Sequence, residues 1–204
     1  MVNISMHKKY AKELAALKKM PGVFKTRDVR KLKIHTRNLS AMVNQGLLEK
    51  ISRGTYRLSG RPQENPDIVN VASRVPKGVV CLISALAYHG LTTQIPREVY
   101  LAAARGTEMP RLDYPPIHLF RFSKEALDSG IETHIIEGVP VRIYNPEKTL
   151  ADCFKFRGKI GLDTAIEALK MYIRSKNKDI NKLITYAKIC RVENIMRPYL
   201  ESLL

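Results

Sequence analysis

The chain has 204 residues, 45% of them hydrophobic, which suffices for one large domain or two small ones with buried cores. Lysine and arginine outnumber aspartate and glutamate by 35 to 19, and the resulting formal net charge of +16 predicts an anionic partner. Cys81, Cys153 and Cys190 form no C-x-x-C motif, which argues against a disulfide framework and a zinc site, and no apolar run could cross a membrane. We therefore expect a soluble, cytoplasmic protein that does not bind membranes.

The positive charge is concentrated at the amino-terminal end. Residues 1–60 carry 14 lysines and arginines against 3 acidic residues, an excess of 11, whereas residues 61–154 carry 10 against 11. Residues 155–204 carry 11 against 5, an excess of 6. An anionic partner is therefore expected first at the amino-terminal third.

The chain begins with a pattern typical of an amphipathic helix over residues 7–20, which Pro21-Gly22 ends. A short extended piece at Val23-Phe24 follows. Thr26 is suited to cap a helix over residues 27–32.

Residues 36–45 form the next predicted helix, because Leu39, Met42 and Val43 recur at helical spacing. Gly46 suits the left-handed position that follows a helix. Residues 47–52 and 55–58 then predict a strand hairpin with Arg53-Gly54 at its tip. Two short helices followed by a basic hairpin are typical of a winged helix-turn-helix that binds DNA, although an interaction module that never binds DNA could carry the same pattern.

Opposite the apolar stripe of the second helix lie side chains that suit the edges of base pairs. We expect the major groove to be contacted by Arg37, Asn38, Ala41 and Asn44. Thr36 and Ser40 are expected to contact phosphates or to cap. Phosphates or the minor groove are expected to be contacted by the wing residues Lys50, Arg53, Thr55 and Arg57, and the DNA backbone by Lys25, Arg27 and Arg30. Each of these side chains would also be compatible with a solvated surface.

Residues 59–66 have the composition of a linker, so we predict a winged helix-turn-helix domain over 1–60 and a second domain over 66–204. The second domain is predicted to be a mixed α+β domain with a small sheet and a helical carboxy-terminal portion. Its predicted helices cover residues 66–75, 79–91 (with Ser84 as an alternative start), 145–156, 162–176, 179–190 and 192–203, and its strands 97–104, 117–122, 131–137 and 139–144. Glu137-Gly138 suits a hairpin turn.

The basic residues of the carboxy-terminal portion predict a second anion-binding surface, for flanking DNA or for RNA, although ordinary exposed helix faces would show the same pattern. They are Lys155, Arg157, Lys159, Lys170, Arg174, Lys176, Lys178 and Lys182.

The sequence contains none of the common catalytic or nucleotide-binding motifs: there is no P-loop, dinucleotide-binding, H-E-x-x-H or G-x-S-x-G motif. The histidines are dispersed, and no Asp/Glu-x-Asp/Glu pair offers the carboxylates that hold Mg²⁺. His89, after an apolar run, fits a satisfied interior histidine better than a site residue, and Thr149 fits helix surface or packing. We expect no catalytic residue, no metal and no cofactor.

Four blocks of the sequence resemble the AbiEi-type antitoxins, the transcriptional regulators of bacterial type IV toxin–antitoxin pairs. They are GLLEKISRGTYRL (46–58), PKGVVCLISALAYHGLT (76–92), VPVRIYNPEKTLADCFKFRGKIGLDTAIEAL (139–169) and RVENIMRPYLESL near the end. The resemblance implies a winged helix-turn-helix that represses its own promoter by binding repeats there. It further implies a role in phage defence and a carboxy-terminal domain that opposes a nucleotidyltransferase-like toxin without a stable complex.

The sequence shows no dedicated dimer helix, so we expect a monomer or a weak dimer that can bind repeats cooperatively. A protein- or RNA-binding module with the front domain as a platform is the alternative function.

Overall fold

The computed structural model describes residues 9–62, 64–108 and 110–204. Residues 7 and 8 of the first predicted helix, including His7, lie outside this range, as does Gln63 of the predicted linker. The chain divides into two compact units, of which the first comprises the chain up to Arg74 together with Ile135–Pro140. The second comprises Val75–His134 and Val141–Leu204. The mixed α+β class is as predicted.

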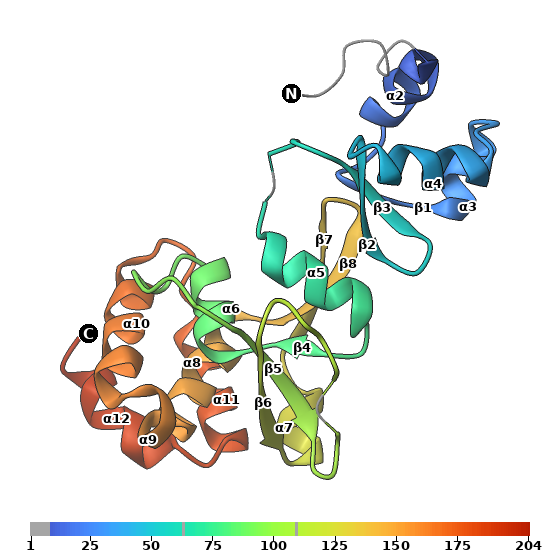
Figure 1. Ribbon diagram of the computed structural model, residues 1–204. Helices are drawn as coiled ribbons and strands as arrows, with labels where there is room; N and C mark the ends of the chain where they lie inside the picture. Colours follow the sequence, from blue (N-terminus) through green and yellow to red (C-terminus); the bar gives the residue numbers. More distant parts are fainter. Residues whose placement is uncertain (1–8, 63, 109) are drawn as a thin grey trace. The chain divides into compact units, whose positions relative to one another are not determined.

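The first unit packs short helices on a three-stranded antiparallel sheet with the strand order β1-β3-β2 (Figure 1). Its core contains Leu17, Val29, Leu39 and Met42, all of which are fully buried. The elements are α2 (Ala11–Lys18), β1 (Val23–Lys25), α3 (Thr26–Lys31), α4 (Thr36–Asn44), β2 (Leu48–Ser52), β3 (Thr55–Leu58) and α5 (Pro66–Arg74).

This unit is larger than the predicted 1–60 domain. Arg74, at the end of α5, donates a hydrogen bond from Nε to the Ile51 carbonyl at 2.9 Å. The Val23 amide donates to the Glu137 carbonyl at 2.7 Å, and Glu137 Oε1 accepts a 2.7 Å hydrogen bond from the Glu64 amide. Both additional segments therefore complete backbone hydrogen bonds that the first sixty residues leave open.

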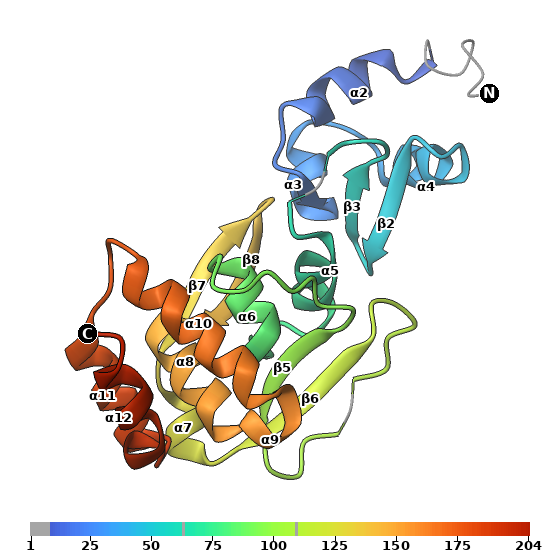
Figure 2. The same ribbon diagram turned by 90° about the vertical axis from the view of Figure 1, so that its left-hand side faces the viewer.

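The second unit is built on a five-stranded mixed sheet with the order β6-β5-β4-β8-β7. β4 pairs antiparallel with β5 and parallel with β8, and β5 pairs parallel with β6. Helices α8, α10, α11 and α12 gather on one side of this sheet in both views (Figure 2). The strands are β4 (Val79–Val80), β5 (Val99–Ala104), β6 (Ile117–Phe122), β7 (Ile131–Ile136) and β8 (Val139–Tyr144). The helices are α6 (Leu82–Tyr88), α7 (Lys124–Asp128), α8 (Pro146–Lys155), α9 (Arg157–Ile160), α10 (Leu162–Arg174), α11 (Ile180–Ile189) and α12 (Glu193–Glu201).

Helix α8 is the buried centre of the second unit. Asn145 caps it by accepting the Lys148 amide at 2.9 Å, and Pro146 occupies its first turn. Lys148 and Asp152 are both completely buried, and their side chains form an ion pair of 2.5 Å between Nζ and Oδ2. Cys190 donates from Sγ to the other oxygen of Asp152 at 3.2 Å, so both carboxylate oxygens have partners.

Three elements of this unit differ from prediction. The start at residue 79 predicted for the helix over 79–91 is wrong, because Val79 and Val80 form the central strand; helix α6 begins at Leu82, closer to the alternative start at Ser84. Two β-branched residues satisfy their backbone groups on neighbouring strands instead of in a helix. The short helices α7 and α9 were not predicted. Glu137 and Gly138, with φ of 51° and 85°, form the predicted hairpin turn.

Within the ranges that the structure describes, no helix is both long enough and apolar enough to span a membrane.

Candidate nucleic-acid interface

A row of apolar side chains anchors helix α4 to the core of the first unit. Leu39 and Met42 have no exposed surface, and Val43 packs against the same core. Arg37, Ser40 and Asn44 are exposed on the helix. The helix ends at Asn44, and Gly46, with φ of 68°, takes the predicted left-handed position after it.

Two residues predicted for the groove-facing side of α4 are directed elsewhere. Asn38 donates from Nδ2 to Glu13 Oε1 of α2 at 3.2 Å, and its side chain is half-buried. Ala41 is half-buried and packs against the small core. Because α2 lies beside this part of α4, Asn38 serves packing between helices in this conformation. The exposed set on α4 is therefore narrower than the sequence suggests. Thr36, at the helix start, is half-buried.

The tip of the hairpin is attached to the start of α3. Thr26 donates twice to the carbonyl of Gly54, from its amide at 2.8 Å and from Oγ1 at 3.1 Å. The Thr26 hydroxyl was expected to cap the helix, but the capping position belongs to Lys25 and no side chain caps there. Thr26 therefore holds α3 and the hairpin tip in a fixed mutual arrangement.

The side chains of the hairpin divide into available and engaged groups. Lys50 and Arg53 are exposed. Thr55 is only 6% exposed, so it is not available to a phosphate. Arg57 forms a cross-strand pair with Glu49, with 2.7 Å from Nε and 2.6 Å from Nη2 to the same carboxylate oxygen. Its guanidinium is therefore partly neutralised within the hairpin.

The cations of α3 are exposed. Arg27 lies 3.8 Å from the Asp28 carboxylate, an exposed pair of small energetic value. Lys25 and Arg30 are exposed as well. Among the described residues, Lys25, Arg30, Arg37, Lys50 and Arg53 form no ion pair. Their positive charge is available to an external anion.

The turn between α3 and α4 adds basic residues that the sequence analysis did not single out. Lys33, with φ of 59°, and His35 are exposed there, as is Lys31 at the end of α3. The Lys31-Leu32-Lys33 sequence before α4 is the pattern from which these basic residues could have been predicted. These side chains lie in the segment that connects the two predicted DNA-facing helices.

The predicted second anionic surface is only partly available. Arg157 donates from Nη1 to the Phe154 carbonyl at 2.9 Å, and Lys182 pairs with the buried Glu147 at 3.2 Å. Lys159 lies over the ring of Phe120, with Nζ 5.5 Å from the ring centroid, and Lys155 is half-buried. Lys159 is nevertheless exposed, as are Lys170, Arg174, Lys176 and Lys178.

His89 and Thr149, the two residues considered for a catalytic role, form hydrogen bonds within the protein. His89 Nε2 lies 2.7 Å from the Tyr144 carbonyl oxygen, and burial lowers the pKa of the imidazole. Thr149 is buried and donates to the same carbonyl at 3.2 Å. The structure also brings His134 near His89, with ring centroids 6.4 Å apart. Within the described part of the chain, no group of three or more His, Cys, Asp or Glu residues is placed to hold a metal ion.

Part of the first unit matches a known protein family. Residues 11–59, from α2 to the end of the hairpin, match the family model described as "Transcriptional regulator, AbiEi antitoxin". No curated protein matches the sequence.

The fold of the whole chain is similar to a solved structure, the RV2827C protein from Mycobacterium tuberculosis. The TM-score is 0.57 at 10% sequence identity, and the similarity covers 95% of this chain and 81% of the other. At this identity the similarity concerns the fold alone. Through residues 11–59 the protein matches the AbiEi antitoxin family of transcriptional regulators, and the resemblance expected from the sequence is confirmed there.

Proposed function

We propose that this protein is a DNA-binding repressor whose first unit is a winged helix-turn-helix. Helix α4 enters the major groove, and the β2–β3 hairpin acts as the wing. Regulation, not catalysis, is the role assigned here. The observation that carries the proposal is a set of exposed cations on α3, α4 and the hairpin that form no ion pair with any residue the structure describes and are held on one small core.

The groove contacts are assigned to the exposed side chains of α4. Arg37 suits the two acceptors of guanine, and Asn44 suits adenine. Ser40 is positioned to bind a phosphate. Lys50 and Arg53 are assigned to the phosphates or the minor groove beside the wing. Lys25, Arg27 and Arg30 are assigned to the DNA backbone. Asn38, Ala41 and Arg57 are secondary candidates because the protein itself engages or partly covers them, and the buried Thr55 is assigned no contact.

The family match over residues 11–59 supports a finer proposal. We propose that the protein binds repeats in its own promoter and acts as the antitoxin of a type IV pair. Its opponent would be a nucleotidyltransferase-like toxin, neutralised without a stable complex. A monomer or weak dimer would bind the repeats cooperatively.

A direct test is fluorescence anisotropy of the full chain with DNA from upstream of its own gene, compared with a shuffled duplex of equal length. We expect preference for the upstream DNA. With roughly six to ten phosphate contacts, affinity should fall by about 10³–10⁵ between 50 and 200 mM salt. Equal affinity for both duplexes would contradict sequence-specific binding.

A second candidate, binding of RNA through the second unit, is favoured by the exposed cations on α10 and in the turn after it. The test is a full-chain variant in which Lys170, Arg174, Lys176 and Lys178 are replaced by glutamine. Under the repressor proposal this variant keeps its preference for upstream DNA over the shuffled duplex. If it instead loses RNA binding while the wild type shows no DNA preference, the second candidate replaces the first.

A further inference from the structure

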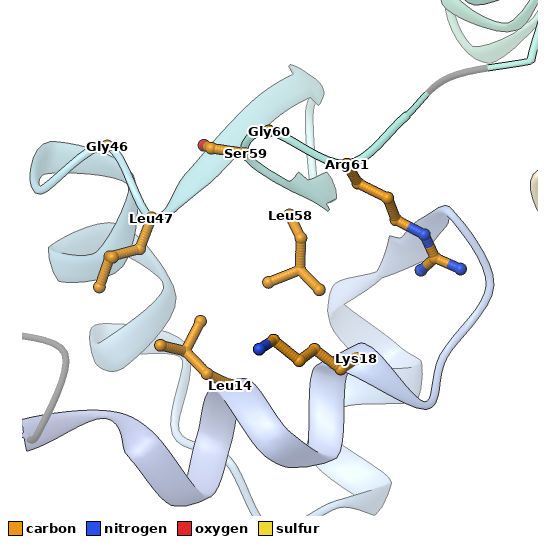
Figure 3. Close-up of a pocket in the computed structure, with 8 residues that line it drawn as sticks. All are labelled: Leu14, Lys18, Gly46, Leu47, Leu58, Ser59, Gly60 and Arg61. Carbon is orange, nitrogen blue, oxygen red and sulfur yellow. The ribbon is translucent and has the colours of Figure 1, made fainter.

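A groove on the first unit is open to solvent, has an apolar floor and is bordered by cations (Figure 3). Leu14 of α2, Leu47 after α4 and Leu58 at the end of β3 supply the floor. The cavity has a volume of about 650 Å³, within the range of roughly 300–1,000 Å³ that is typical of small-ligand sites. The remaining lining residues are Lys18, Gly46, Ser59, Gly60 and Arg61.

The charges at this groove are all of one sign. In Figure 3 the Lys18 side chain extends from α2 toward the space between Leu14 and Leu58. Arg61 lies at the edge, where Nη1 donates to the Met20 carbonyl at 3.0 Å and the other guanidinium donors remain. In the part of the chain that the structure describes, neither cation forms an ion pair, and no acidic residue lines the groove.

The glycines keep the mouth of the groove open. Gly46 and Gly60 have φ of 68° and 72°, and a Cβ built on either would have no heavy atom within 4 Å. The space beside these two glycines is therefore not filled by neighbouring side chains.

We propose that this groove binds a small amphipathic carboxylate, whose aliphatic body covers the leucines while its carboxylate pairs with Lys18 and Arg61. The cationic border favours an anionic molecule over a neutral lipid, and the apolar floor favours one with an aliphatic body. The apolar part of the lining comprises three leucines from three segments. A carboxylate should bind more tightly than an alcohol of the same length, because its hydrogen bonds with the two cations are charge-assisted.

The inference is independent of DNA binding, because none of the groove residues belongs to the set assigned to DNA. Failure of one proposal therefore leaves the other standing.

The test uses octanoate as the probe and 1-octanol as its uncharged match, titrated into the ¹⁵N-labelled full chain. We expect saturable shifts of the amide signals of Gly46, Leu47, Ser59 and Gly60 with octanoate. Octanol should bind at least about tenfold more weakly, as the loss of one charge-assisted hydrogen bond implies. Equal affinity for the two probes, or no saturable shift in these amides, would overturn the proposal.

Two substitutions and a control locate the site. Lys18→Gln should weaken octanoate binding by about tenfold and leave octanol binding unchanged. Ser59→Trp, which fills the groove from a half-buried position, should weaken both. Lys12→Gln, on the same helix but outside the groove, should change neither. If Lys12→Gln weakens octanoate binding as much as Lys18→Gln, general charge attraction explains the binding and the site is refuted. An unchanged amide spectrum away from the groove confirms that each variant is folded.

Discussion

Thr26 donates two hydrogen bonds to one acceptor, the carbonyl oxygen of Gly54, at 2.8 Å from its amide and 3.1 Å from its hydroxyl. The first residue of α3 thereby fixes the tip of the hairpin 28 residues later in the chain. In the proposed complex these two elements contact the same duplex. Their arrangement before binding reduces the ordering cost of binding.

Replacing Thr26 by valine tests this attachment, because it removes the hydroxyl and keeps the β-branched shape. We expect a loss of about 0.5–1.5 kcal/mol in the free energy of unfolding, measured by urea denaturation. Amide hydrogen exchange at Gly54 should also accelerate. Stability and exchange equal to those of the wild type would show that the backbone hydrogen bond suffices.

The buried pair of Lys148 and Asp152 gives a second prediction. Burial raises the pKa of the Asp152 carboxyl, and the adjacent ammonium group opposes that shift. Asp152→Ala would leave Lys148 buried without its carboxylate, between the rings of Tyr144 and Phe122 at 4.0 and 4.9 Å. The expected loss is about 3–5 kcal/mol in the free energy of unfolding.

The matched control for this prediction is the double variant Lys148→Met with Asp152→Leu. Since it removes both charges together, it should lose much less stability than the single variant. If the double variant is as unstable as Asp152→Ala, the loss in the free energy of unfolding comes from side-chain packing and not from an unpaired buried charge.

Gly138 gives a third prediction, because its φ is +85° and a Cβ there would come 2.6 Å from Cβ of Pro21. We expect Gly138→Ala to lower the free energy of unfolding by about 2–4 kcal/mol, from the left-handed backbone and the close contact together. Gly60→Ala shares the positive φ but meets open space, so about 1–2 kcal/mol is expected there. Equal losses in thermal or urea denaturation would exclude the contact with Pro21 as a contributor.

The cysteines give a fourth prediction. Burial raises the pKa of the Cys81 and Cys153 thiols well above their ordinary value and that of Cys190 to about 12. All three thiols are free and buried, and the thiolate is the reactive form. At pH 8 the native protein should therefore react very slowly with a disulfide reagent, whereas the urea-unfolded protein should release three equivalents rapidly. Fast reaction of a single thiol in the native state would locate a local opening.

Local patterns in the sequence predicted much of the fold. Helical spacing placed Leu39 and Met42 in the core, and the glycine after α4 marked its end. The Asn145-Pro146 pair marked the start of α8, where both residues act as expected. These features depend on neighbours a few residues apart, which a single sequence displays.

Features that depend on distant partners were not predicted. Val79 and Val80 looked like the start of a buried helix, but they pair with Ala102 and Leu101 of β5. In the sequence, nothing near Asn38 indicates a partner for its side chain, but its amide donates to Glu13, which lies 25 residues earlier. The candidate interface was therefore predicted as a segment, whereas the availability of each side chain in it depends on the tertiary structure.

In the proposed complex, α4 reads DNA through Arg37. The most direct measurement compares wild type, Arg37→Ala and the control Arg174→Ala, by fluorescence anisotropy on upstream DNA and on duplexes with single base-pair changes. We predict that Arg37→Ala costs about 1–3 kcal/mol in binding and relaxes the preference at one base pair, while Arg174→Ala changes neither. Unchanged affinity and base preference in Arg37→Ala would contradict the proposed docking of α4.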